Sequence, residues 1–297
     1  MRVLLIYYTG TYNTRYLTNL LKLELSKQDN EIDVVEVKGD TPICQTDNYD
    51  LIGIGYPIYA FNSPRLLNRY LKKIAFKKQQ KFFIYKQSGE TYKVNNASSR
   101  TIKKIIRKRK GILKVEHHFL LPYDIHFRFP DSLVKQELLY DNKLLKVLIY
   151  ELNNNVDYQI KSNLIYDINS WLFSIQKIGG FINGPLYKVD RKKCIDCNIC
   201  ITTCPVKNIY KDKNNLIKFK RRCEMCMRCS MYCPKDAISI GILNGWKVNG
   251  PYQFDRILAD QTNSGDFIKG NEKGFYKCFH RSFKEIDDLY NATFKQE

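Results

Sequence analysis

The feature that constrains this chain most is the crowding of its cysteines. The 297-residue sequence contains ten, and eight of them lie between residues 194 and 233. Disulfide frameworks distribute cysteines through small secreted chains, whereas here most neighbouring cysteines are separated by only two residues. The N-terminus, MRVLLIYYTG, has a short apolar stretch without a small-residue cleavage site. The pattern therefore indicates metal binding in a reducing, cytoplasmic compartment.

The eight clustered cysteines form two copies of the motif Cys-x-x-Cys-x-x-Cys-x-x-x-Cys-Pro. This is the spacing of bacterial proteins that bind two [4Fe-4S] clusters, in which the fourth cysteine of each copy reaches the other cluster. We therefore predict two ligand sets, which are Cys194, Cys197, Cys200 and Cys233 for one cluster and Cys204, Cys223, Cys226 and Cys229 for the other. Two structural zinc sites are the alternative, but zinc is usually bound by separated pairs of ligands, often with His.

The residues between the cysteines fall into two groups. The apolar ones, which are expected to keep water from the sulfur atoms, are Ile195, Ile199, Met225 and Met227. The polar ones, which are expected to face solvent, are Asp196, Asn198, Glu224 and Arg228. Residues 191–235 also contain twelve Lys and Arg against three Asp and Glu. This charge favours an acidic electron carrier as a partner, and the alternative is a solvated loop that only balances the charge of the clusters.

Strand-like and helix-like patterns alternate over the first 120 residues. The expected strands are 3–9, 31–37, 50–57, 81–86 and 112–122, and the expected helices are 13–27, 65–74 and 98–110. Such alternation predicts an α/β fold with a doubly wound, five-stranded parallel sheet. We divide the chain into a sheet domain (1–150), a helical connector (151–184) that Gly179 and Gly180 end, a cysteine domain (185–240) and a C-terminal tail (241–297) without a clear pattern.

The turn after the first strand is a candidate anion site. Its residues are Thr9, Gly10, Thr11, Tyr12, Asn13 and Thr14. Hydroxyl groups, a glycine and free N–H groups at the start of a helix can bind an anion. In doubly wound sheets, ligands bind at the carboxyl ends of the strands, where this turn is expected to lie.

Two further loops are expected at the same edge of the sheet. The first follows the third strand and contains Tyr56, Tyr59 and Phe61, and the second follows the fourth strand and contains Ser88, Gly89 and Tyr92. Aromatic side chains in these loops could enclose a flat ring. The three loops together predict a flavin site. The alternative, in a chain with 21 tyrosines, is that these aromatics are ordinary core or surface residues.

With both ends considered, residues 1–240 resemble the fusion proteins of anaerobic bacteria that join a flavodoxin domain to a two-cluster ferredoxin. The resemblance implies a flavodoxin-like sheet followed by an α+β ferredoxin domain. It also implies that Thr9, Thr11, Asn13 and Thr14 hold the phosphate of FMN, with the loops at 56–62 and 87–92 beside its ring. Tyr12 stands where that phosphate loop usually has glycine.

Three functions remain open at this point. The first is an electron-transfer flavo-iron–sulfur protein that passes single electrons between two [4Fe-4S] clusters, FMN and a redox partner protein. The second is an FMN-dependent reductase of a small molecule, fed by its own clusters. The third, which Tyr12 keeps open, is a docking module that has lost its flavin. A membrane span is not expected, because no apolar run reaches about 18 residues. Nucleic-acid binding would rest only on the net charge of +19 and the basic helix at 98–110.

Overall fold

The computed structural model describes residues 1–90, 92–174 and 176–294. Its N-terminal part is a five-stranded parallel sheet with the order β2-β1-β3-β4-β5. The strands are β1 (Arg2–Tyr7), β2 (Glu31–Glu36), β3 (Leu51–Pro57), β4 (Lys81–Ser88) and β5 (Ile112–Leu120). This is the flavodoxin-like order of a doubly wound sheet, so the fold predicted for the N-terminal part is confirmed.

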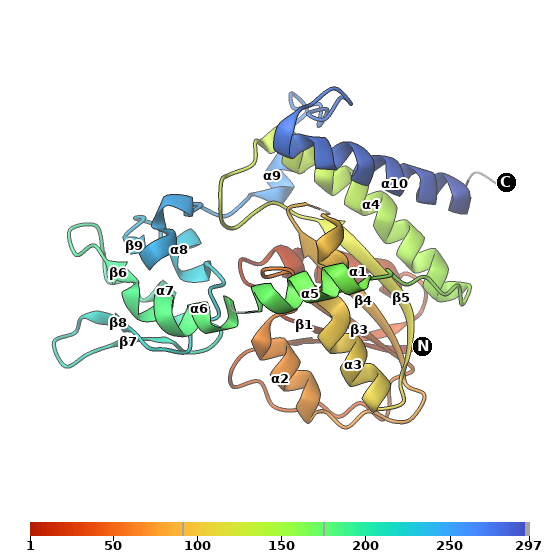
Figure 1. Cartoon of the computed structure of the whole chain (residues 1–297), viewed down its shortest axis with the longest axis horizontal. Helices are drawn as coiled ribbons and strands as arrows, with labels where there is room; N and C mark the ends of the chain where they lie inside the picture. Colours follow the sequence, from red (N-terminus) through yellow and green to blue (C-terminus); the bar gives the residue numbers. More distant parts are fainter. Residues whose placement is uncertain (91, 175, 295–297) are drawn as a thin grey trace.

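Helices cover both faces of the sheet (Figure 1). They are α1 (Asn13–Ser26), α2 (Arg65–Lys73), α3 (Arg100–Lys108) and α4 (Asp131–Asn153), and the 3-10 helix η1 (Lys93–Ser99) precedes α3. Because successive side chains of a strand point to opposite faces, each strand contributes to two separate cores. On β1, Leu5 packs with α1 and α4, whereas Leu4 packs with α2 and α3. This alternation explains why the strands read as continuous apolar runs.

Much of the segment expected as a tail belongs to the sheet domain, whereas its first residues pack on the cysteine domain through Leu243. It contains η3 (Gly241–Trp246), α9 (Phe254–Ala259), η4 (Gly274–Tyr276) and α10 (Lys277–Phe294). Phe279, Phe283 and Ile286 of α10 are buried in the core that α1 and α4 cover. The rings of Tyr140 and Phe283 stack with their centroids 4.1 Å apart, and α10 runs beside α4 (Figure 1). The chain therefore leaves the sheet domain after α4 and returns to complete it.

The connector contains α5 (Leu164–Phe173), α6 (Gln176–Asn183) and the 3-10 helix η2 (Gly184–Leu186). The prediction that Gly179 and Gly180 end a helix is wrong, because both lie within α6. A Cβ atom on Gly180 would lie 2.0 Å from the carbonyl oxygen of Cys223, and one on Gly179 would lie 3.1 Å from the sulfur of Met225. The two glycines therefore allow α6 to approach the cysteine domain closely.

The cysteine domain has two similar halves. Its elements are β6 (Lys188–Val189), α7 (Ile199–Thr202), β7 (Ile209–Lys211), β8 (Ile217–Phe219), α8 (Arg228–Met231) and β9 (Ile238–Ser239). The antiparallel pairs are β6 with β9 and β7 with β8. Each short helix begins inside one cysteine motif. The two short helices contact each other, so the two motifs lie side by side. Among the helices that the structure describes, none is both long and apolar enough to cross a bilayer.

Candidate functional site

Four cysteines surround a first cavity in the cysteine domain. They are Cys194, Cys197, Cys200 and Cys233. The first three come from one motif, and the fourth comes from the end of the other. Ile195 and Ile199 also line this cavity, yet both side chains are partly open to solvent, and Cys197 is exposed. The structure therefore brings this predicted ligand set together, and it leaves one side of the cavity accessible.

Four further cysteines surround a second cavity, and they are Cys204, Cys223, Cys226 and Cys229. The fourth cysteine of the first motif again joins three from the second motif. This cavity is better shielded than the first, because Cys226 and Met227 are buried and Tyr187 covers another side. The cysteines of the two motifs thus gather into the two sets expected from their spacing.

Backbone N–H groups point at the sulfur atoms in both halves. The N–H of Asn208 donates to the sulfur of Cys204 at 3.2 Å, and the N–H of Ala237 donates to that of Cys233 at the same distance. Hydrogen bonds of this kind stabilise thiolates and help set the potential of an iron–sulfur cluster. Asn198 and Met227 each have a positive φ just before a short helix, at 59° and 56°. This turn allows three cysteines of a motif to line one cavity.

The donor set and its surroundings fit a multi-atom cluster. Four cysteines line each cavity, and four cysteine thiolates are the usual ligands of a [4Fe-4S] cluster. Burial raises the pKa of the Cys226 thiol to about 11 and that of Cys223 to about 12. Cluster assembly must therefore displace protons from these thiols.

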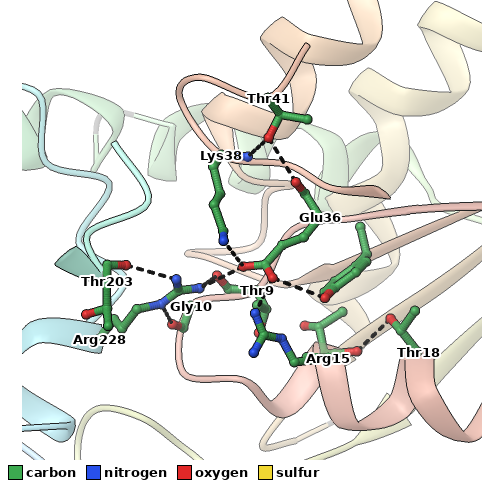
Figure 2. A network of polar contacts seen from close by, with 11 residues as sticks. Thr9, Gly10, Arg15, Thr18, Glu36, Lys38, Thr41, Thr203 and Arg228 are labelled. Carbon is green, nitrogen blue, oxygen red and sulfur yellow. Dashed lines mark hydrogen bonds and ion pairs between the residues drawn. The ribbon is translucent and has the colours of Figure 1, made fainter. Parts of the chain in front are cut away.

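The anion loop, residues 9–14, is attached to the cysteine domain through its carbonyl groups. The Arg228 guanidinium donates to the carbonyl oxygens of Thr9 and Gly10, each at 2.6 Å. The hydroxyl of Tyr232 donates to the carbonyl oxygen of Thr11 at 3.0 Å. Figure 2 shows Arg228 reaching from the cysteine domain to the loop. Three consecutive carbonyl groups of the loop are thereby fixed in direction.

The same geometry leaves the N–H groups of the loop available. In a trans peptide, the N–H of one residue points away from the C=O of the residue before it. The N–H groups of Gly10, Thr11 and Tyr12 are therefore directed away from Arg228 and Tyr232, and none donates to another described residue. Consecutive N–H groups in such a turn form an anion-binding nest. The hydroxyl of Thr9 is buried and has no partner among the described residues. The loop therefore fits a phosphate group.

Tyr12 does not lie over these N–H groups. Its backbone is left-handed, with φ of 71°. Its ring lies 4.5 Å from the guanidinium carbon of Arg228 and 4.3 Å from that of Arg15, and it meets the ring of Tyr232 edge to face. Arg228 and Tyr232 belong to the cysteine domain, and Arg15 belongs to α1. The side chain that replaces the usual glycine therefore belongs to the junction between the domains.

The expectation that Arg228 and Glu224 face solvent is wrong. The Arg228 side chain is 2% exposed, and it also donates to the carbonyl oxygen of Thr203 at 3.0 Å. Glu36, at the end of β2, lies 3.6 Å from it and also pairs with Arg15 (Figure 2). The Glu224 side chain is 5% exposed and faces Arg69 of α2. Nothing in the sequence distinguishes these charged residues from exposed ones, because their partners are distant along the chain.

The second cavity lies directly against the anion loop. A Cβ atom on Gly10 would lie 2.9 Å from the carbonyl oxygen of Cys226 and 2.1 Å from the hydroxyl of Tyr59. Cys226 and Val206 belong to the same hydrophobic core as Leu4 and Ile6 of β1. The N–H of Gly39 also donates to the carbonyl oxygen of Pro205 at 2.7 Å. The sheet and the second cavity are therefore parts of one packed unit.

The structure does not bring the other predicted flavin contacts together. Asn13 donates to the carbonyl oxygen of Pro122, and Thr14 accepts a hydrogen bond from Gln87. Three of the aromatic residues pack on other parts of the chain: Tyr56 is buried in the core near Ser98, Phe61 meets Phe173 and Tyr92 meets Phe275. Tyr59 does lie against Gly10 of the anion loop, where its ring also meets that of Tyr8. Ser88 is bonded to His118, and Gly89 lies against Tyr123. Thr91 lies outside the described residues. We therefore assign none of them to a flavin ring.

Asp124 lies beside the anion loop and gives a prediction on pH. Burial raises the pKa of this carboxyl group to about 7, and the hydroxyl of Thr11 faces it at 3.5 Å. Because an unfolded Asp has a pKa of about 3.9, the folded chain holds this proton more tightly. The protonated Asp124 therefore makes its whole contribution to the free energy of unfolding below about pH 4, and this contribution is lost as the pH rises through about 7. Replacing Asp124 with Asn should abolish this contribution to the pH dependence of the urea midpoint, and an unchanged pH profile would contradict it.

The comparisons with known proteins give only distant similarities. No protein family model matches the chain, and no curated protein does. A short-chain flavodoxin associated with a bacterial microcompartment is similar with 13% identity and a TM-score of 0.36, over 41% of this chain and 86% of that one. Flavodoxin 2 from Bacillus cereus is similar with 17% identity and a TM-score of 0.33, over 40% of this chain and 86% of that one. A flavodoxin from the domain Archaea is similar with 10% identity and a TM-score of 0.34, over 52% of this chain and 99% of that one. The flavodoxin-like description of the N-terminal part rests on its strand order.

Proposed function

We propose that this chain is an electron-transfer flavo-iron–sulfur protein. The observation that carries the proposal is the contact between Gly10 of the anion loop and Cys226 of the second cysteine set. Bound [4Fe-4S] clusters would supply single-electron transfer at low potential, and FMN would supply the capacity for one or two electrons. The residues of the chain bring these two kinds of site into direct contact.

The roles of the residues follow from their positions. The two cysteine sets would hold the clusters, and Asn208 and Ala237 would donate to their sulfur ligands. The N–H groups of residues 10–12 and the hydroxyl of Thr9 would bind the phosphate of FMN. Arg228 and Tyr232 hold this loop from the other side. The first cysteine set, with its exposed Cys197, would be the more open of the two to solvent.

A cysteine substitution tests the assignment of the second set. Replacing Cys226 with Ser is expected to reduce the iron content of anaerobically purified protein from about eight to about four atoms per chain, because one of two clusters loses a ligand. The matched control is Cys44→Ser, because Cys44 lies outside both sets. Iron and sulfide assays measure the outcome. Equal iron in the two variants, or zinc in place of iron, would refute the assignment.

A flavin assay separates this proposal from a docking module that has lost its flavin. The purified chain should bind one FMN, and replacing Thr9 with Val should weaken binding because a buried hydroxyl is lost. Titration of flavin fluorescence measures the dissociation constant. A chain with intact clusters that does not bind FMN would favour the docking module instead.

A further inference from the structure

Two consecutive helices of the connector present apolar side chains to solvent. We define the apolar stripe by six of them, which are Leu164, Ile168, Trp171, Ile178, Phe181 and Ile182. Their exposed fractions run from 48% at Ile168 to 74% at Leu164. Scattered exposed apolar residues are common on protein surfaces, but a cluster of this size usually marks an interaction site.

Helix α5 differs from an ordinary surface helix in which side chains it buries and which it exposes. Ser170, which is buried, donates to the carbonyl oxygen of Phe61 at 2.9 Å and is bonded to Asn62. A polar residue therefore faces the protein, whereas Leu164, Ile168 and Trp171, at spacings of four and three, face solvent. This is the reverse of the usual amphipathic arrangement. The sequence of α5 is thus suited to covering by a second molecule.

The α6 part of the stripe lies over the Cys223 loop of the second cysteine set. On the inner side of α6, a Cβ atom on Gly180 would lie 2.0 Å from the carbonyl oxygen of Cys223. A Cβ atom on Gly184, in the following helix η2, would lie 2.7 Å from the Cβ atom of Cys223. The exposed Ile178, Phe181 and Ile182 are on the same helix. A molecule that covers α6 is therefore separated from the Cys223 loop by a single helix.

Basic residues border the stripe beside α6. The guanidinium carbon of Arg221 lies 5.0 Å from the centre of the Phe181 ring. Lys218, Lys220 and Arg222 are exposed in the same segment, which lies next to η2. An apolar centre with a charged rim is the usual anatomy of a specific protein interface. The sign of this rim requires an acidic partner.

We infer that the apolar stripe is the docking surface for an acidic redox protein that exchanges electrons through the second cysteine set. The inference rests on the proposed function, and it adds the partner's surface and its chemistry. A second copy of the chain fits less well, because each carries a net charge of +19 and like charges repel.

Binding measurements test this inference without relying on electron-transfer activity. The probe is a purified flavodoxin with an acidic surface, titrated calorimetrically into the anaerobically purified, cofactor-containing chain. The double variant Trp171→Gln with Phe181→Gln should bind it about tenfold or more weakly. Arg221→Glu should also weaken binding, and its effect should shrink as salt screens the charges. The matched control is Leu23→Gln, because Leu23 is 56% exposed on α1, far along the chain.

The outcomes distinguish an acidic protein from a lipid surface or a second copy of the chain. They also separate the docking surface from the proposed electron-transfer function. Equal affinity of the double variant and the parent chain, or no binding of the acidic probe by the parent, would overturn the inference. Binding to anionic lipid vesicles, or self-association in sedimentation, that only the parent shows would identify another occupant. Iron and flavin assays on the same samples report on the proposed function separately. Stripe-dependent binding in a chain that holds no iron would retain the docking surface and refute the proposed electron path.

Discussion

Replacing Arg228 with methionine is expected to weaken FMN binding about tenfold or more and to lower the free energy of unfolding by about 3 kcal/mol. The guanidinium donates to the carbonyl oxygens of Thr9, Gly10 and Thr203 and lies 3.6 Å from Glu36. Without the guanidinium, buried carbonyl groups lose their hydrogen-bond partners, and the peptide groups of the anion loop can change their orientation. The N–H groups that would bind the phosphate then lose their common direction.

The control for this variant is Arg107→Met, because Arg107 is exposed near the end of α3. Flavin titration and urea denaturation of both variants measure the two effects. Burial alone would lower the pKa of Arg228, but the charges around it, Cys226 first, raise it overall, so the residue is charged throughout such an experiment. A variant that keeps its affinity for FMN would show that Arg228 does not shape the loop.

Replacing Gly10 with alanine is expected to force the sheet and the cysteine domain apart, at a cost of about 2 kcal/mol in stability. The new Cβ atom would lie 2.1 Å from the hydroxyl of Tyr59 and 2.9 Å from the carbonyl oxygen of Cys226. The first contact involves the end of a side chain, whereas the second involves backbone. Tyr59→Phe should therefore rescue Gly10→Ala only in part.

Gly245→Ala is the matched control, since a Cβ atom there would meet nothing within 4 Å. The unfolding temperature, the iron content and the affinity for FMN should all fall in Gly10→Ala. All three should remain unchanged in Gly245→Ala. Full rescue by Tyr59→Phe would mean that Cys226 can move away without loss. No effect of Gly10→Ala at all would mean that the two domains are not in contact at this loop.

The sheet was predictable from the sequence because its central strands β1, β3 and β4 are buried on both faces. A segment such as 51–57 must then be apolar throughout, and its pattern is visible without any partner. The C-terminal segment was not predictable in this way. Phe279, Phe283 and Ile286 are buried at helical spacing, but the surrounding sequence is polar and their partner helix α4 ends more than a hundred residues earlier.

The candidate site also has a part that was predictable from the sequence and a part that was not. The two cysteine sets follow from spacing that is local to each motif, so the residues that line each cavity could be anticipated. The junction could not, because it consists of pairs distant in sequence, such as Arg228 with Gly10. The glycines at 179 and 180 mislead for the same reason. They look like the end of a helix, and only the position of Cys223 shows that they allow close packing.

The most direct test of the account is a crystal structure of anaerobically purified protein with FMN, using anomalous scattering at the iron edge. We predict one iron cluster within each cysteine set and the phosphate of FMN on the N–H groups of Gly10, Thr11 and Tyr12. Zinc in either set, no iron beside Cys226, or a phosphate bound elsewhere would contradict the claim that a cluster and a flavin meet at this loop.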